Sequence, residues 1–161
     1  MKGKTMKTQH IQIGMIPAIL YGEPAQRGYL FLHGQMGHKE EAAAFAPIAC
    51  PKGYQVLSID LPGHGERQNR DEVFTPWTAV PDIQAALYWS KQHWKTVSLR
   101  ANSIGAYFAM LALDTPRRAL LVSPIMDMER LILTMMGWAG VTEEELRERG
   151  EIATSFGQTL S

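Results

Sequence analysis

The sequence contains a single cysteine, Cys50, in 161 residues. One thiol forms no disulfide within the chain, and there is no CxxC pair or cluster of cysteine and histidine of the kind that holds structural zinc. The sequence therefore offers no covalent or metal cross-link, and it implies no cofactor or metal. We expect a protein of a reducing compartment.

An excess of charge of either sign is also missing. Lysine and arginine together number 16, as do aspartate and glutamate, so the formal net charge is zero. Because no basic field surrounds such a chain, we expect no binding to nucleic acid and no attraction to an anionic lipid surface.

Long hydrophobic runs are absent as well. The longest nearly apolar runs, residues 42–50 and 104–113, fall short of the roughly 20 residues that a membrane-spanning helix needs. Polar residues at positions 8–10 follow the basic start of the chain, where a secretion signal would have an apolar segment. We therefore expect a soluble, cytoplasmic protein with no membrane association.

What is present is sufficient apolar material for one core. The chain is 45% hydrophobic and 20% charged, which is typical of globular proteins, and a chain of this length buries roughly 70% of its unfolded surface. Four apolar runs predict strands buried on both faces of a parallel sheet: residues 29–32, 54–59, 96–99 and 119–122. Upstream, residues 11–15 and 16–21 predict two antiparallel strands at a sheet edge.

Helical patterns alternate with these strands, over residues 39–50, 76–93 and 104–113. Alternation of this kind predicts the α/β class, with a mostly parallel sheet and helices on both faces. From Asp127 the pattern changes to an apolar helix over 131–138 and an acidic helix that starts at Thr142 with a capping box. We expect no further buried strand. Residues 1–125 are therefore predicted to form the α/β core, and 126–161 a separate helical segment.

Ser103 stands where a predicted strand turns sharply into a helix, within Ala101-Asn102-Ser103-Ile104-Gly105. A turn this tight strains the backbone at the serine, and it needs small residues two positions before and two after. The amides at the start of the following helix point toward the serine, where they can stabilise an oxyanion. A serine and a glycine before a helix also make an ordinary N-cap, so the pentapeptide alone leaves both interpretations open.

Two upstream segments extend this pattern. Residues 33–37, His-Gly-Gln-Met-Gly, close one predicted strand, and residues 60–65, Asp-Leu-Pro-Gly-His-Gly, close the next. Together with the serine turn, which has Ala101 in place of the first glycine of G-x-S-x-G, they resemble the α/β-hydrolase superfamily from residue 11 to about 128. The resemblance implies that Ser103 is the nucleophile and that the backbone amides of Gln35 and Ile104 bind the oxyanion. It assigns no catalytic role to the acid and the histidine of residues 60–65, for which turn-capping and structural roles are expected.

The remaining catalytic groups are not evident. A serine nucleophile needs a base, normally a histidine oriented by a carboxylate, and the superfamily order is serine, acid, histidine. All the histidines of this chain precede Ser103. Asp127 lies where some members place the acid, although an N-cap for the helix of 128–138 is the favoured interpretation. The segment after 126 resembles part of the helical cap, and the last strands and helix of the family are missing. We favour a fragment of a longer hydrolase; a natural short relative without catalysis is the alternative.

The function implied by the resemblance is hydrolysis of a carboxylic ester or related acyl bond through an acyl-enzyme on Ser103, with a small-molecule acyl substrate. A non-catalytic binding or scaffold domain is the second hypothesis. A nucleotide-binding domain is disfavoured, because residues 101–106 lack the paired glycines that approach a pyrophosphate. The strand of 119–122 would be an unguarded sheet edge, so we also expect a homodimer or association with the missing C-terminal segment.

Overall fold

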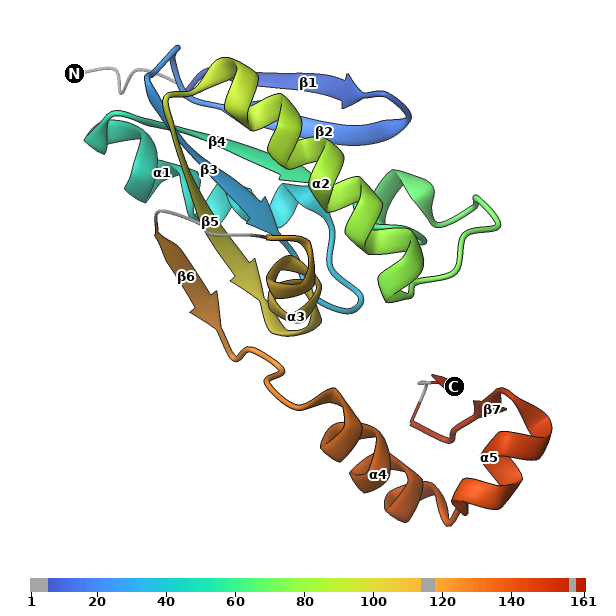
Figure 1. Cartoon of the computed structure of the whole chain (residues 1–161). Coiled ribbons are helices and arrows are strands. Elements are labelled where there is room, and N and C mark those ends of the chain that lie inside the picture. Colours follow the sequence, from blue (N-terminus) through green and yellow to red (C-terminus); the bar gives the residue numbers. More distant parts are fainter. Residues whose placement is uncertain (1–5, 114–117, 157–158) are drawn as a thin grey trace. The chain divides into compact units, whose positions relative to one another are not determined.

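Six strands form one sheet: β1 (Thr8–Ile13), β2 (Ile16–Tyr21), β3 (Arg27–Leu32), β4 (Tyr54–Ile59), β5 (Thr96–Asn102) and β6 (Ala119–Val122). Their order is β1-β2-β4-β3-β5-β6 (Figure 1). The computed structural model describes residues 6–113, 118–156 and 159–161. The chain divides into two compact units, residues 1–124 and 125–161.

The sheet is parallel from β4 through β3 and β5 to β6, and antiparallel where β1 and β2 join it. Alternate side chains of β3 and β4 enter two apolar clusters, one on each face, whereas β5 contributes apolar side chains to the α2 and α3 face alone. Helices α2 (Pro76–His93) and α3 (Ser103–Ala112) cover one face, and α1 (Ala46–Ala49) lies on the other (Figure 1). Burial on both faces is why β3 and β4 have continuous apolar runs. The expected α/β class is confirmed.

β6 lies at the end of the described sheet, as expected for residues 119–122, but its exposure differs from the expectation. Leu120 and Val122 are 40% and 45% exposed, whereas the central strands are buried on both faces. Among the described residues, β6 pairs with β5 alone, so it lacks the second neighbour that would cover it. The prediction of a strand was right, and the prediction of burial on both faces was wrong.

The helix expected over residues 39–50 is also a correction. The structure has three short pieces there: η1 (Lys39–Ala44), α1 and η2 (Cys50–Lys52). Pro47 and Pro51 lie at the starts of the second and third pieces. A proline has no N–H to donate and collides with the preceding turn of a helix, so one continuous helix is not formed. In contrast, α2 begins and ends at the predicted residues.

The second unit contains α4 (Met128–Ala139) and α5 (Glu143–Arg149), and the predicted capping box is present at Thr142. The expectation of helices alone was wrong, because β7 (Ile152–Ala153) and β8 (Thr159–Leu160) form a short antiparallel pair. Ile152 and Leu160 bury their side chains with Met136 in a small apolar cluster, which gives this unit its own core.

Candidate functional site: the carboxyl edge of the parallel strands

Three adjacent parallel strands place the sequence motifs at one edge of the sheet. β3 is followed by residues 33–37, here called the His-Gly loop, and β4 by residues 60–65, here called the Pro-Gly loop. β5 ends at Asn102, immediately before Ser103. Because these strands are parallel neighbours, their carboxyl ends meet at the same edge, which is where open α/β sheets bind ligands.

Ser103 has the strained backbone expected of it. Its φ is +50°, in the left-handed region, at the junction between β5 and α3. A residue with a side chain adopts this conformation at a cost of about 1–2 kcal/mol, which the surrounding structure has to offset. The predicted backbone conformation of the turn is confirmed, and the role of Ser103 as a nucleophile stays a prediction.

The His-Gly loop packs tightly against this turn. A Cβ at Gly105 would lie 2.1 Å from the carbonyl oxygen of His33, and a Cβ at Gly34 would lie 3.2 Å from the Cβ of Ser103. Gly105 therefore needs to be a glycine because the His-Gly loop packs against it, and not only because the Ser103 turn is tight. Ala101 is fully buried in the core beneath the turn.

The residues expected to bind an oxyanion lie on both sides of this contact. Gln35 is exposed within the His-Gly loop, and Ile104 is half-buried in the first turn of α3. Met36, the residue after Gln35, has a φ of +60°, and the Gly37 amide closes the loop by donating to the carbonyl of Gly34 at 3.1 Å. The roles of the Gln35 and Ile104 amides stay predictions.

Two buried histidines join the His-Gly and Pro-Gly loops. The Leu61 amide donates to Nε2 of His33 at 3.0 Å, and the Met36 amide donates to Nε2 of His64 at 3.1 Å. Since each Nε2 accepts a hydrogen bond, it carries no proton, and the proton of the neutral ring is on Nδ1. Through this proton His33 donates a hydrogen bond to the Gly34 carbonyl and His64 to the Pro62 carbonyl, both at 2.8 Å. Neither histidine has a ring nitrogen left for Ser103, so a dyad of Ser103 and His33 is not supported.

Burial sets the protonation state of His33. The residue is 0% exposed, and this burial lowers the pKa of its imidazole to about 4, although its hydrogen bond to Gly34 acts in the opposite direction. Near neutral pH the ring is therefore uncharged, as its acceptor role toward Leu61 requires.

Asp60 holds the Pro-Gly loop and has the structural role expected for it. Its carboxylate accepts from the Lys39 amide and the Lys39 ammonium, each at 2.8 Å, and from the Glu66 amide at 3.0 Å. Gly65, with φ +54°, passes so close that a Cβ there would lie 2.1 Å from Oδ1 of Asp60. The carboxylate is thus fully engaged in organising the loop around it.

Lys39 is the partner that sequence reasoning missed. Its side chain is only 1% exposed, yet it also pairs with Glu66 at 2.7 Å and Glu40 at 3.0 Å. Burial opposes its charge, but the hydrogen bonds from Asp60, Glu66 and Glu40 outweigh burial and raise the pKa of the ammonium. A lysine beside two glutamates is typical of an exposed helix face, so the sequence carried no signal of this burial.

The other candidate groups serve local structure. Asp127 caps α4 in the second unit, where its Oδ1 accepts from the Arg130 amide at 2.9 Å; a catalytic role for this acid stays a prediction. His38 pairs with Glu40 at 2.9 Å, and His93 packs on Trp89 near the end of α2. Within the described residues, no group of three or more potential ligand side chains is placed to hold a metal ion.

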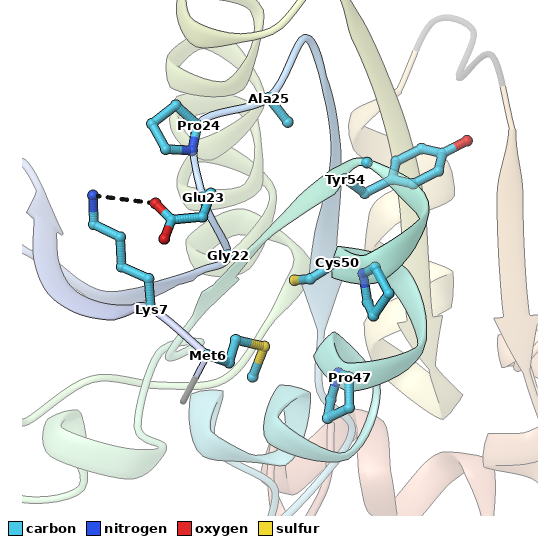
Figure 2. A pocket seen from close by; sticks show the side chains of 11 residues that line it. Met6, Lys7, Gly22, Glu23, Pro24, Ala25, Pro47, Cys50 and Tyr54 are labelled. Atoms are coloured by element: carbon cyan, nitrogen blue, oxygen red, sulfur yellow. Dashed lines mark ion pairs between the residues drawn. The ribbon is translucent and has the colours of Figure 1, made fainter. Parts of the chain in front are cut away.

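A hollow of about 450 Å³ lies at the amino ends of β3 and β4, the opposite end of these strands from Ser103 (Figure 2). Tyr54 and three prolines line it, and Cys50 contributes its thiol. Burial raises the pKa of that thiol, which keeps it protonated and weakly nucleophilic near neutral pH. None of the motif residues lines this hollow.

In the part of the chain that the structure describes, no helix has the length and apolar character to cross a membrane.

The fold and the Ser103 turn are those of an α/β hydrolase, and comparison with known proteins agrees. The model of the alpha/beta hydrolase family matches residues 29–158, so the chain belongs to this family. A serine hydrolase-like protein of Dictyostelium discoideum is 31% identical over 109 residues, which are 63% of this chain and 29% of that protein.

Two solved structures share the fold at low identity. Est1E from Butyrivibrio proteoclasticus, in a structure with ferulic acid bound, has a TM-score of 0.67 and 18% identity, covering 95% of this chain and 67% of its own. An esterase from Pyrococcus furiosus has a TM-score of 0.65 and 17% identity, covering 92% of this chain and 63% of its own. The chain thus spans less than a third of the curated relative and about two thirds of these two structures.

Proposed function

We propose that this chain carries the nucleophile and oxyanion loops of a serine hydrolase that cleaves a carboxylic ester or a related acyl bond. The observation that carries the proposal is the left-handed Ser103, at the junction of β5 and α3, with the backbone of Gly34 packed against it. Such a turn lifts the hydroxyl out of the strand and sets it at the first turn of a helix, where amides favour developing negative charge. The esterases among the structural neighbours support the choice of an acyl bond.

In the proposed reaction, the Ser103 oxygen attacks the acyl carbon and loses its proton to a base. The carbonyl oxygen becomes an oxyanion, which the amides of Gln35 and Ile104 stabilise. The bond to the leaving oxygen then breaks, that oxygen takes up a proton, and water hydrolyses the acyl-serine. We place the base outside the histidines beside the site, because both ring nitrogens of His33 and of His64 are already engaged.

The test compares the chain with Ser103→Ala and with Ser123→Ala. Ser123 is a matched control because it also has a positive φ, +46°, just after a strand, but no helix follows it directly. Because no base for Ser103 is evident in this chain, we expect a fluorophosphonate probe to label Ser103 slowly, with the help of the oxyanion amides alone. Peptide mass spectrometry reads the labelling, and the Ser123→Ala protein should be labelled equally. Hydrolysis of p-nitrophenyl acetate should depend on Ser103 and should be far slower than the roughly 10 per second of a typical enzyme.

Two results would count against the proposal. Equal labelling of the original chain and Ser103→Ala would favour the non-catalytic binding domain. A Ser103-dependent kcat near 10 per second would show that an effective base lies within this chain, against the expectation that the chain lacks one.

A further inference from the structure

Two hydrogen bonds, one in each direction, join the two loops that border Ser103. His33 of the His-Gly loop accepts from Leu61 beside Pro62, and His64 of the Pro-Gly loop accepts from Met36. The two imidazole rings lie 5.1 Å apart, and Phe74 packs on His64 at 4.4 Å. Each histidine therefore reaches across to the backbone of the opposite loop.

The two hydrogen bonds between the loops differ in the residues whose amides donate them. The bond of His33 ends on Leu61, which is buried in the core. The bond of His64 ends on Met36, whose backbone is left-handed at φ +60° while its side chain is 87% exposed. For a residue other than glycine, this left-handed conformation costs about 1–2 kcal/mol of free energy. Because an exposed side chain contributes little packing, the backbone hydrogen bond is what offsets that cost.

Met36 directly follows Gln35, whose amide is expected to bind the oxyanion. The φ and ψ angles of Met36 decide the direction in which the chain leaves Gln35, and the Gly37 amide then turns back to the Gly34 carbonyl at 3.1 Å. Gly34 itself lies against Ser103. A loss of the Met36 conformation would therefore move the Gln35 amide relative to the serine.

We propose that His64 is a positioning residue of the Ser103 site: its Nε2 holds the Met36 amide and thereby the Gln35 amide in place. The inference rests on the proposed function, since it assigns His64 to the same site. His64 acts through the loop backbone and touches neither substrate nor the reacting atoms.

A pair of substitutions separates the two ring nitrogens of His64. In His64→Asn the side-chain amide reaches only the place of Nδ1, so it keeps a donor for the Pro62 carbonyl and loses the acceptor for Met36. In His64→Gln the side-chain oxygen reaches the place of Nε2 and restores that acceptor. Phe74→Leu is the matched structural control, because it removes the ring packed on His64 and leaves both hydrogen bonds in place.

Two readouts are needed on the 161-residue chain: amide hydrogen exchange at Met36 by NMR, and the rate at which a fluorophosphonate labels Ser103. We expect His64→Asn to speed exchange at Met36 and to slow labelling, each by about tenfold, which is less than the loss on deleting an oxyanion donor outright. His64→Gln should return both values to within about threefold of the original chain, and Phe74→Leu should change neither beyond that range.

Unchanged exchange at Met36 in His64→Asn would overturn the proposal, as would equal effects of Asn and Gln at position 64. Slowed labelling in Phe74→Leu to the level of His64→Asn would also overturn it, because general loosening would then explain the result. If the original chain is labelled no faster than Ser103→Ala, the proposed function fails, and exchange at Met36 still decides whether His64 holds the loop.

Discussion

Gly105→Ala tests the contact between the Ser103 turn and the His-Gly loop. The new Cβ would lie 2.1 Å from the carbonyl oxygen of His33, and the nearest atoms are backbone, which cannot rotate away as a side chain can. Relief needs a displacement of about 1 Å between α3 and the end of β3, and overpacking of this kind typically costs about 1–3 kcal/mol. We expect about 3 kcal/mol, the upper end, because two rigid elements have to move.

Thermal unfolding followed by circular dichroism measures this cost. For a chain of this size, about 3 kcal/mol lowers Tm by about 10 °C. Ala101→Gly, in the same turn, should cost less, about 1–2 kcal/mol, through strand flexibility and the loss of one buried methyl group. Gly137→Ala is a second control, because a Cβ there meets nothing within 4 Å; it lies in α4 of the second unit and should leave unfolding of the first unit unchanged.

We expect Gly105→Ala to be clearly the least stable of the three variants. A Tm for Gly105→Ala within 2 °C of the original chain would refute the close approach. So would a destabilisation by Ala101→Gly equal to that by Gly105→Ala, because the restriction would then belong to the turn alone and not to the His33 carbonyl.

Three further predictions concern stability and association. The pKa of His33 is about 4 in the folded chain and 6.5 is its ordinary value, so the unfolded chain binds more protons between these pH values. The free energy of unfolding should therefore fall by about 2 kcal/mol from pH 7.5 to pH 5. A urea titration that shows the same fall in His33→Asn would contradict this. Lys39→Met leaves the Asp60 carboxylate buried without its cation and should lower the free energy of unfolding in urea by about 3–5 kcal/mol. Adding Asp60→Asn should restore part of that loss. No recovery of stability in the double variant would argue against the ion pair of Lys39 and Asp60. Sedimentation should show association that grows from micromolar to near-millimolar concentration and is weakened by Leu120→Lys on β6, so a single monomeric species throughout would exclude that edge as an interface.

The parts of the fold that were predictable are those determined by neighbouring residues. The strands β3 and β4 follow the expected pattern, because their apolar side chains are buried on both faces of the sheet. β5 was predicted as a strand, but its apolar side chains enter the core on one face only. Helix α2 starts at Pro76, where proline fits the first turn of a helix. Residues 39–50 were mispredicted because their helical composition outweighed Pro47 within the range and Pro51 just after it. The exposure of β6 depends on which strands lie beside it, and its own residues do not encode that.

The candidate site was likewise predictable only where neighbouring residues determine its structure. The strain at Ser103 was predictable because a small residue, serine and glycine at fixed spacing restrict one turn. The ties that organise the surrounding loops join residues far apart in the sequence: Lys39 to Asp60 and Met36 to His64. A buried lysine and a histidine bonded to a backbone amide look, in sequence, like any lysine or histidine of a polar loop. Only the folded arrangement shows what they contact.

The position of β3 at the centre of the parallel strands has a consequence during protein synthesis. Its residue Arg27 pairs with Tyr54 of β4 on one side and with Thr96 of β5 on the other. Residues 33–95, which number 63, lie between β3 and β5. Their synthesis takes about 3–13 s at the usual rate of about 5–20 residues per second. For that interval one edge of an apolar strand has no partner from its own chain, and such edges pair with other chains. We therefore expect aggregation to compete with folding during this interval, and a chaperone that shields strand edges should raise the yield of folded protein without changing the stability of the folded chain.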